Sequence, residues 1–329
     1  LRMAAAGQAV PGDGDATLNL TSWSDIAAGS GAAVGMGDSG NDRISINVNG
    51  VIGGDGPATL LAGSGDDVFF SDGIVSIGHN TGGDATLYGG EGDDRYVFFF
   101  STNIANAGKA TVDGGSGSDT LLFFEFADVA EQTGAAALLS GGSGGDWFLF
   151  LGEANVADDG SATLFGGPGD GGRSFSSGSD IADYSGGDAY AGSTATLFGG
   201  SGADVVAMAD NSNFAADGQA SLFGGSGDDV LALWGGSVAL ESGSGALIAG
   251  DDGADTISMG SATDFAAAGQ ATALGGAGDD LVNLASYVDV AAAAGSSATL
   301  FGGSGGDRVL LRFEGAFADG GTAPLFGGR

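Results

Sequence analysis

One short pattern recurs along the chain about every 26 residues. In the copy that begins at Ala220 it reads Ala-Ser-Leu-Phe-Gly-Gly-Ser-Gly-Asp-Asp-Val-Leu-Ala-Leu, which predicts a short strand, a glycine-rich turn and a second short strand. Further copies begin at Ala58, Ala85, Ala110, Ala137, Ala162, Ala195, Ala246, Ala271 and Ala298, with a degenerate copy at Ala33 and a truncated copy at Ala323. Such a fixed recurrence is typical of a solenoid, in which each repeat packs against its neighbours.

The spacing of the copies predicts the architecture. From Ala33, successive copies begin 25, 27, 25, 27, 25, 33, 25, 26, 25, 27 and 25 residues apart, and the extra residues fall outside the turn. Insertions of two or eight residues keep the alternation of inward and outward side chains along a strand, so they fit side loops on a regular coil. We therefore expect an all-β fold, a right-handed parallel β-helix or β-roll solenoid of about twelve coils with 25–27 residues each.

Two segments depart from this regularity. Residues 1–32 echo the later repeats only loosely, and we expect a degenerate capping coil there, because terminal repeats are often atypical. Residues 33–329 form the predicted solenoid, with an irregular stretch at 168–194 in which Gly171 takes the place of an Asp found in the other turns. This stretch is interpreted as a tolerated surface loop, or alternatively as a lateral contact or a break between two sub-rods.

The aligned copies also predict the core. The Ala that opens each copy, the apolar residue two positions later, and the apolar residues after the turn recur in register. We expect them to face inward together, because alternate residues of a strand point to the same side. The apolar column before the turn contains Leu60, Leu87, Val112, Leu139, Leu164, Leu197, Leu222, Ile248 and Leu300.

The turn has six positions, which are Gly224 to Asp229 in the copy that begins at Ala220. Glycine at positions one, two and four permits positive φ and close backbone approach. Such a turn aims backbone carbonyls at one point, where Asp at position six adds a carboxylate. Oxygen ligands of this kind suit a hard cation with flexible coordination, Ca²⁺ before Mg²⁺. Position six is Asp in ten copies: Asp42, Asp67, Asp94, Asp119, Asp146, Asp204, Asp229, Asp255, Asp280 and Asp307.

The turns resemble those of the repeats-in-toxin (RTX) family, whose pattern is G-G-x-G-x-D followed by any residue and a large apolar one. Residues 302–310, Gly-Gly-Ser-Gly-Gly-Asp-Arg-Val-Leu, match at every specified position, as do residues 89–97 and 224–232. The resemblance implies a parallel β-roll in which Ca²⁺ lies between successive coils, held by turn carbonyls and by the ten Asp carboxylates. One departure is that each repeat here has one such turn, so we expect one ladder of ions along one edge.

The simpler interpretation is that these turns are tight, soluble connections, since Gly and Asp are common in turns. Ten Asp residues in register, each followed by an apolar residue at the same spacing, favour the metal. The net charge of −34 also opposes a compact metal-free form, because like charges repel. About ten Ca²⁺ ions would offset about 20 of these charges, so we expect folding to be coupled to Ca²⁺.

Composition argues against several other classes. With 42 acidic and 8 basic residues, the chain is poorly suited to nucleic acid or an anionic membrane. It has no run of 18 apolar residues, so no membrane span is expected. Catalysis has little support, because there is no Cys, and the single His, His79, falls in a predicted loop. We therefore do not expect an enzyme.

Two outward-facing columns are candidate surfaces. One holds Thr59, Thr86, Thr111, Thr163, Thr196, Thr272 and Thr299, with Ser221 in register. It is interpreted as a stabilising strand ladder, interrupted by Leu138 and Leu247, or alternatively as an ice-binding face. The other is apolar and includes Phe70, Val97, Leu122, Leu149 and Leu310, with Phe99, Phe124 and Phe126 nearby. It is expected to be covered by the return segment, to join subunits, or to bind a ligand.

The favoured function is a secreted, extracellular or cell-surface structural protein that depends on calcium and self-associates into a surface layer, matrix or filament. The alternatives are an adhesin or ice-binding rod, with a possible glycan-binding surface, and the calcium-binding tail of a larger secreted toxin or hydrolase. The chain begins Leu1-Arg2-Met3 and ends within a turn, as expected of a segment of a longer polypeptide.

Overall fold

The structure is a computed structural model, and it describes residues 8–9, 14–21, 25–26, 33–37, 39–47, 50–152, 154–157, 159–175, 193–209, 212–260, 263–285, 288–312 and 315–327. All regular elements within these ranges are β-strands. The chain divides into two compact units, residues 1–167 and 168–329. Each unit is described by itself.

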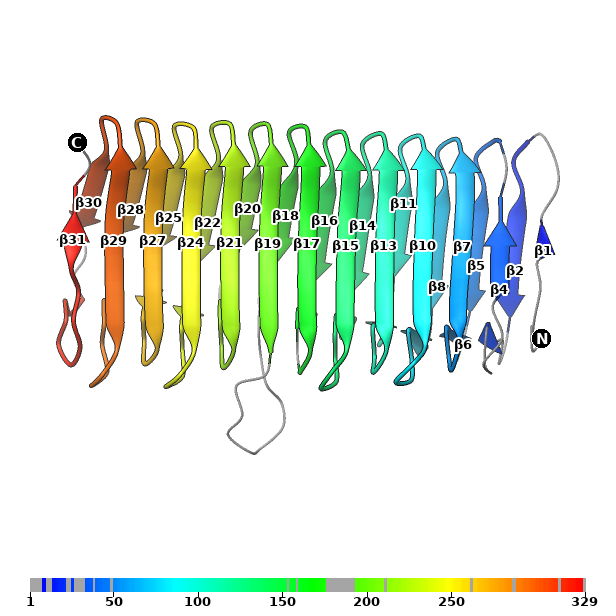
Figure 1. The fold of residues 1–329 in the computed structure, drawn as a ribbon, viewed down its shortest axis with the longest axis horizontal. Coiled ribbons are helices and arrows are strands. Elements are labelled where there is room, and N and C mark those ends of the chain that lie inside the picture. Colours follow the sequence, from blue (N-terminus) through cyan, green and yellow to red (C-terminus); the bar gives the residue numbers. More distant parts are fainter. Residues whose placement is uncertain are drawn as a thin grey trace. The chain divides into compact units, whose positions relative to one another are not determined.

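The first unit contains two long parallel sheets and one short one (Figure 1). Its first sheet holds the strands before the glycine turns: β1 (Gln8–Ala9), β4 (Ala33–Met36), β7 (Pro57–Ser64), β10 (Asp84–Glu91), β13 (Lys109–Ser116), β15 (Ala136–Ser143) and β17 (Ser161–Pro168). Its second sheet holds the strands after the turns: β2 (Thr17–Thr21), β5 (Arg43–Asn47), β8 (Val68–Asp72), β11 (Arg95–Phe98), β14 (Thr120–Phe124) and β16 (Trp147–Leu151). The short sheet lies in the return segments: β3 (Asp25–Ile26), β6 (Gly50–Ile52), β9 (Val75–Ile77) and β12 (Asn103–Ile104).

The second unit repeats this plan. The strands before the turns are β19 (Thr194–Ser201), β21 (Gln219–Ser226), β24 (Gly245–Asp252), β27 (Gln270–Ala277), β29 (Ser297–Ser304) and β31 (Leu325–Phe326). The strands after the turns are β18 (Gly172–Phe175), β20 (Val205–Met208), β22 (Val230–Trp234), β25 (Thr256–Gly260), β28 (Leu281–Ala285) and β30 (Arg308–Arg312). Two short strands, β23 (Ser237–Val238) and β26 (Asp264–Phe265), pair in the return segments.

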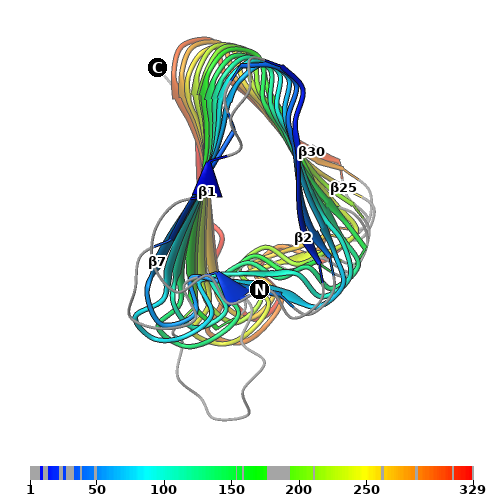
Figure 2. The same cartoon turned by 90° about the vertical axis from the view of Figure 1, so that its right-hand side faces the viewer.

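Neighbouring strands are parallel and one repeat apart in sequence. Ala85 on β10 pairs with Ala58 on β7 and with Ala110 on β13, so the opening Ala residues of successive copies lie side by side. In the second unit, Ala220 pairs with Ala195 and with Ala246 in the same way. A view along the stack shows β7 and β2 on opposite walls of the coil (Figure 2). The predicted all-β parallel solenoid is therefore confirmed.

The predicted inward columns form the core. All nine residues of the apolar column before the turn are at most 1% exposed, and Leu231 and Leu233 after the turn are buried as well. In the first unit, aromatic side chains fill the space behind the second sheet. Phe123 stacks on Phe150 with ring centroids 4.4 Å apart and lies 5.1 Å from Phe98. These rings are fully or almost fully buried and add packing contacts between coils.

Among the described residues, the return segments turn at a small residue with left-handed backbone. A φ between 50° and 59° recurs at Ala105, Ala130, Ala157, Ala215, Ala239, Ala266, Ala291 and Ala318. In earlier copies Gly53 and Gly78 take φ values of 65°. The left-handed conformation costs an L-residue about 1–2 kcal/mol, so tight packing must hold these corners. A Cβ on Gly53 would lie 2.5 Å from the carbonyl oxygen of Asp84, which shows how closely adjacent coils approach there.

The irregular segments are described only in part. Within residues 1–32, strands β1, β2 and β3 pair with β4, β5 and β6, so the described residues of this segment already follow the coil. Of the stretch 168–194, residues 176–192 lie outside the described residues. The interpretation of this stretch as a surface loop, a lateral contact or a break therefore falls mainly on residues outside the described ranges.

Candidate cation-binding edge

The glycine turns lie where each first-sheet strand passes into the second sheet. The reason why glycine is needed differs between the positions of the turn. Position two takes positive φ in almost every copy, as in Gly225 at 115°, and position four does so in every described copy, as in Gly227 at 127°. Residues with a side chain rarely adopt this conformation. Asp251, at position two with a φ of 74°, is the exception. Position one needs glycine because a Cβ there would lie too close to the Asp side chain of position six.

The ten predicted Asp residues form one continuous ladder within each unit. One carboxylate oxygen, Oδ1, accepts the N–H of the position-six residue in the preceding turn, with N–O distances of 2.6–3.1 Å. Nine of these Asp residues are buried, with 0–4% of their surface exposed, and Asp307 in the last complete turn is half-buried. The Asp therefore has a structural task of its own, because it satisfies a backbone donor of the neighbouring coil.

The second carboxylate oxygen has no such partner in most copies. Oδ2 is buried without a hydrogen-bond partner in Asp67, Asp94, Asp119, Asp204, Asp229, Asp255, Asp280 and Asp307. A buried carboxylate oxygen without a donor is costly, and its recurrence in successive turns calls for a common explanation. Either a cation or a proton would relieve it.

The unpartnered oxygen faces the glycine at position one. A Cβ placed on Gly224 would lie 2.4 Å from Asp229 Oδ2 and 2.6 Å from the carbonyl oxygen of Gly250, the position-one residue of the next turn. We call this space the oxygen cradle: it adjoins a position-one glycine and is lined by Oδ2 of the same turn and the position-one carbonyl of the next. In nine turns a Cβ on the position-one glycine would approach Oδ2 to within 2.0–2.9 Å: Gly37, Gly89, Gly114, Gly141, Gly199, Gly224, Gly250, Gly275 and Gly302.

The turn that contains Asp67 differs from the others. Position one there is Ala62, which is 1% exposed, so a methyl group stands where the other turns have glycine. This turn supplies a natural comparison for the glycine-lined cradles.

Within the described residues, no group of three or more His, Cys, Asp or Glu side chains is placed to hold a metal. A cation at this edge would therefore depend on backbone carbonyls as well as on single Asp carboxylates.

Burial also changes the acidity of the ladder. Loss of hydration raises the pKa of Asp94, Asp119 and Asp229 from 3.8 to about 7, and neighbouring carboxylates raise it further against the opposing backbone hydrogen bond. Burial likewise raises the pKa of Asp67 and Asp255 to about 6. The folded turn therefore disfavours a bare negative charge, and a cation or a proton at Oδ2 would offset it.

A second ladder, which sequence reasoning missed, runs along the exposed side of the turns. At position five, the N–H of Asp93 donates to Asp66 Oδ1 of the preceding turn at 2.9 Å, and the N–H of Ala254 donates to Asp228 Oδ1 at 2.9 Å. The acceptors of this ladder are Asp15, Asn41, Asp66, Asp93, Asp170, Asp228 and Asp279. Recurrence of Asp or Asn at position five is visible in the sequence and was the available signal.

The two outward columns have different surroundings. The Thr side chains are half-buried, and Thr86 pairs with Thr59 and Thr111, but Leu138 and Leu247 interrupt the row. In the outward apolar column after the turn, Val97 and Leu122 are only 6% and 5% exposed, so the middle of this column is covered within the first unit.

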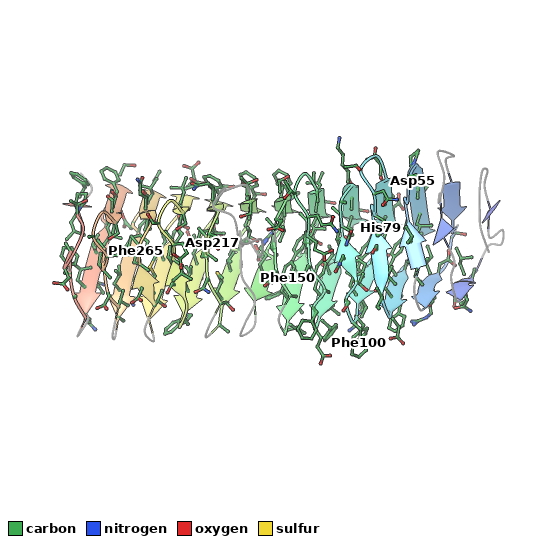
Figure 3. All side chains as sticks on the ribbon, turned by 90° about the horizontal axis from the view of Figure 1, so that it is seen from below. Asp55, His79, Phe100, Phe150, Asp217 and Phe265 are labelled. Atoms are coloured by element: carbon green, nitrogen blue, oxygen red, sulfur yellow. The ribbon has the colours of Figure 1, made fainter. Side chains whose placement is uncertain are left out.

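Aromatic residues just beyond the apolar column remain open to solvent. Phe100 and Phe126 are 52% and 54% exposed, and Phe99 stacks on Phe124 with ring centroids 4.4 Å apart. Figure 3 shows Phe100 projecting from the edge of the strands, whereas Phe150 lies among them. We call Phe99, Phe100, Phe124 and Phe126 the aromatic patch.

Comparison with known proteins gives no match to a family model, a curated protein sequence or a solved structure. The likeness to RTX turns therefore rests on the residues of the turns themselves. Among the described residues, none forms a helix of the length and apolar character needed to cross a membrane.

Proposed function

We propose that this chain is a calcium-dependent structural solenoid, in which Ca²⁺ ions bind at the oxygen cradles and join successive turns. The observation that carries the proposal is the row of buried, unpartnered Asp Oδ2 atoms beside backbone carbonyls. Two acceptor atoms that share one space repel each other unless a positive group lies near them. The polar atoms nearest the position-one glycines are all oxygens, which suits a hard cation.

Calcium fits this donor set better than the other common cations. Asp carboxylates and turn carbonyls are its usual ligands, and it accepts six to eight oxygens in flexible geometry. Mg²⁺ demands near-ideal octahedral geometry and keeps several waters, while Zn²⁺ prefers His and Cys. The chain has no Cys and a single His. When bound, each ion would supply charge that offsets the net charge of −34 and would couple folding to metal.

The proposal predicts the number of ions. Nine turns combine Asp at position six with glycine at position one. Equilibrium dialysis of the full chain at saturating Ca²⁺ is expected to give about nine ions per chain, and the urea midpoint of the folded chain is expected to be lower in chelator than in Ca²⁺. A chain that binds fewer than two ions would contradict the proposal.

A single substitution tests the assignment of the ligand. In Asp229→Asn, the Asn Oδ1 still accepts the N–H of Asp204, while Nδ2 provides a donor on the side of the Gly250 carbonyl. The variant is therefore expected to fold and to bind one ion fewer. The matched control is Asp228→Asn, which changes the exposed position-five ladder and is expected to keep the full number of ions. Equal capacity in both variants would exclude Asp229 as a ligand.

We further propose that the protein is secreted and assembles into a surface layer, matrix or filament. The high extracellular calcium concentration favours occupied sites of moderate affinity. The aromatic patch supports self-association, because soluble monomers rarely expose several large aromatic side chains together.

Imaging and sedimentation test this assembly. Wild type is expected to form regular assemblies in Ca²⁺ that disperse in chelator. The double substitution Phe100→Ser and Phe126→Ser is expected to weaken assembly without changing the number of bound ions. Ile74→Ser is the matched control, because Ile74 is 64% exposed and lies outside the patch. A wild-type chain that stays monomeric at high protein and calcium concentrations would refute the assembly proposal.

A further inference from the structure

One turn departs from the pattern at two positions together. Position six is Gly171 instead of Asp, and two residues later Arg173 takes the place of the apolar residue found in the other copies. Arg173 on β18 pairs in register with Val206 on β20, which in turn pairs with Leu231 on β22. Val206 and Leu231 are both buried. The arginine therefore occupies a core position.

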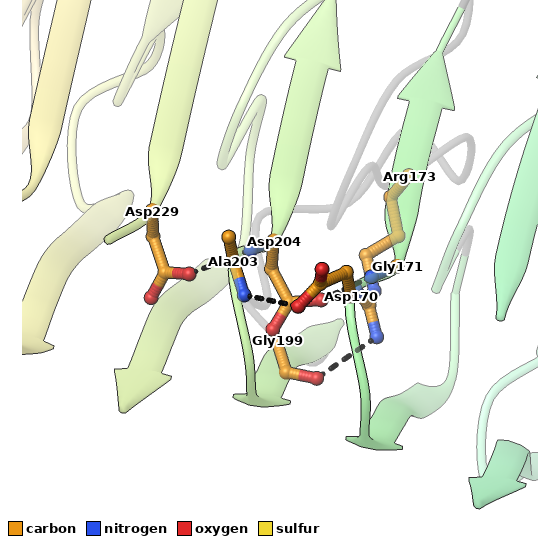
Figure 4. A network of polar contacts seen from close by, with 7 residues as sticks. All are labelled: Asp170, Gly171, Arg173, Gly199, Ala203, Asp204 and Asp229. Atoms are coloured by element: carbon orange, nitrogen blue, oxygen red, sulfur yellow. Dashed lines mark hydrogen bonds and ion pairs between the residues drawn. The ribbon is translucent and has the colours of Figure 1, made fainter. Parts of the chain in front are cut away.

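The Arg173 side chain is fully buried and reaches the edge of the glycine turns (Figure 4). Its Nη2 donates to the carbonyl oxygen of Gly199 at 3.3 Å, and its Nη1 lies 3.7 Å from Asp204 Oδ1. The same Oδ1 accepts the N–H of Gly171 at 3.0 Å, as in the regular ladder. The guanidinium thus contacts two oxygens of the next turn: the carbonyl oxygen of position one and the carboxylate Oδ1 of position six.

Gly199 is the position-one residue of its turn, so its carbonyl corresponds to the Gly250 carbonyl that lines the cradle beside Gly224. In a regular turn this carbonyl shares the cradle with Oδ2 of the preceding Asp. Here that Asp is absent, and a positively charged donor meets the carbonyl in its place. The loss of the carboxylate and the gain of the arginine compensate each other, because a buried guanidinium requires nearby oxygen acceptors.

We propose that Arg173 is a built-in cation, which takes the place of the metal ion in this turn and keeps it closed when the metal is removed. This inference rests on the proposed calcium sites of the other turns. A role for Arg173 in core packing alone predicts no extra protection of the Gly171 amide in chelator.

The first test restores the regular turn. The double substitution Gly171→Asp and Arg173→Val creates the missing carboxylate and removes the internal cation. Equilibrium dialysis with Ca²⁺ is expected to rise from about nine ions per chain to about ten. If wild type binds about nine and the double variant binds no more, the role of Arg173 is refuted while the calcium sites stand. If wild type binds none, the proposed function fails first.

The second test uses hydrogen exchange of the wild-type chain in chelator. The amides of Gly171 and Asp229 each donate to a position-six carboxylate within the second unit, at 3.0 and 2.8 Å. Because the guanidinium of Arg173 adds a charged contact to the carboxylate that accepts the Gly171 amide, protection at Gly171 is expected to exceed that at Asp229 by about tenfold or more. Equal protection factors at the two amides would overturn the inference.

Single substitutions separate charge from packing. Arg173→Lys keeps a cation and is expected to retain both the wild-type ion count and the protection of Gly171 in chelator. Arg173→Val removes the cation without supplying a carboxylate. It is expected to leave the ion count unchanged and to reduce protection at Gly171 to the level of Asp229. Retained protection in the Val variant would show that the charge of Arg173 is not needed.

Discussion

Gly224→Ala tests the oxygen cradle by filling it with one methyl group. The added Cβ would lie 2.4 Å from Asp229 Oδ2 and 2.6 Å from the Gly250 carbonyl oxygen, well inside normal contact distance. The carboxylate can rotate away, but the carbonyl belongs to the backbone of β24 in the next coil. The φ of Gly224 is not in the left-handed region, so backbone strain does not contribute. The effect is therefore one of space.

Both the stability and the ion count are expected to respond. Overpacking of a tight interior costs about 1–3 kcal/mol, which a urea titration at saturating Ca²⁺ measures as a lower midpoint with an unchanged slope. Equilibrium dialysis is expected to show one ion fewer, because the methyl group occupies the space beside the two oxygens. The matched variant is Ala62→Gly, which removes the methyl group that stands at position one before Asp67 and is expected to add one ion. An unchanged ion count in Gly224→Ala would refute the cradle as the binding place.

Two further predictions concern pH and the corners of the coil. Without Ca²⁺, the pKa values of Asp94, Asp119 and Asp229 are raised to about 7 in the folded chain, which therefore binds protons more tightly than the unfolded chain. The stability that these protons add to the folded chain is present below pH 3.8 and is lost as the pH rises through about 7. The urea midpoint in chelator should therefore fall from pH 5 to pH 8, and a rise would contradict the assignment. Ala215 is buried with a φ of 57°. Ala215→Gly should change the free energy of unfolding by less than about 1 kcal/mol, because the relief of backbone strain offsets the loss of the buried methyl group. Ala215→Val should lower the free energy of unfolding several-fold more, because a β-branched residue fits the left-handed conformation poorly. Equal urea midpoints for the Gly and Val variants would show that the corner does not constrain the side chain.

The parts of the structure that follow from periodicity were predictable from the sequence. The opening Ala and the Leu column recur at fixed spacing, and alternation along a strand then assigns both to the interior. The Asp ladder was predictable as a column for the same reason. Its hydrogen bonds were not, because nothing in the sequence distinguishes an Asp that only binds metal from one whose Oδ1 also accepts an N–H of the next coil.

Other features depend on close contacts between coils that periodicity does not describe. The left-handed corner at Ala215 looks in sequence like any small residue of a return segment. Val97 and Leu122 belong to a column that faces outward by alternation, and the sequence left open whether the chain itself, another subunit or a ligand covers it; both residues are buried within the first unit. Arg173 breaks the apolar column and could be taken for a surface charge until its contacts with Gly199 and Asp204 are known. Compensating changes of this kind require the three-dimensional pairing of two turns.

Structure determination of the full chain in saturating calcium, with the ions located by their anomalous scattering, tests the central claim most directly. The account predicts one ion beside each position-one glycine that precedes an Asp, including Gly89, Gly224 and Gly275, and no ion beside the guanidinium of Arg173. Empty cradles in which the Asp Oδ2 atoms instead donate as protonated carboxyl groups to the neighbouring carbonyls would contradict it.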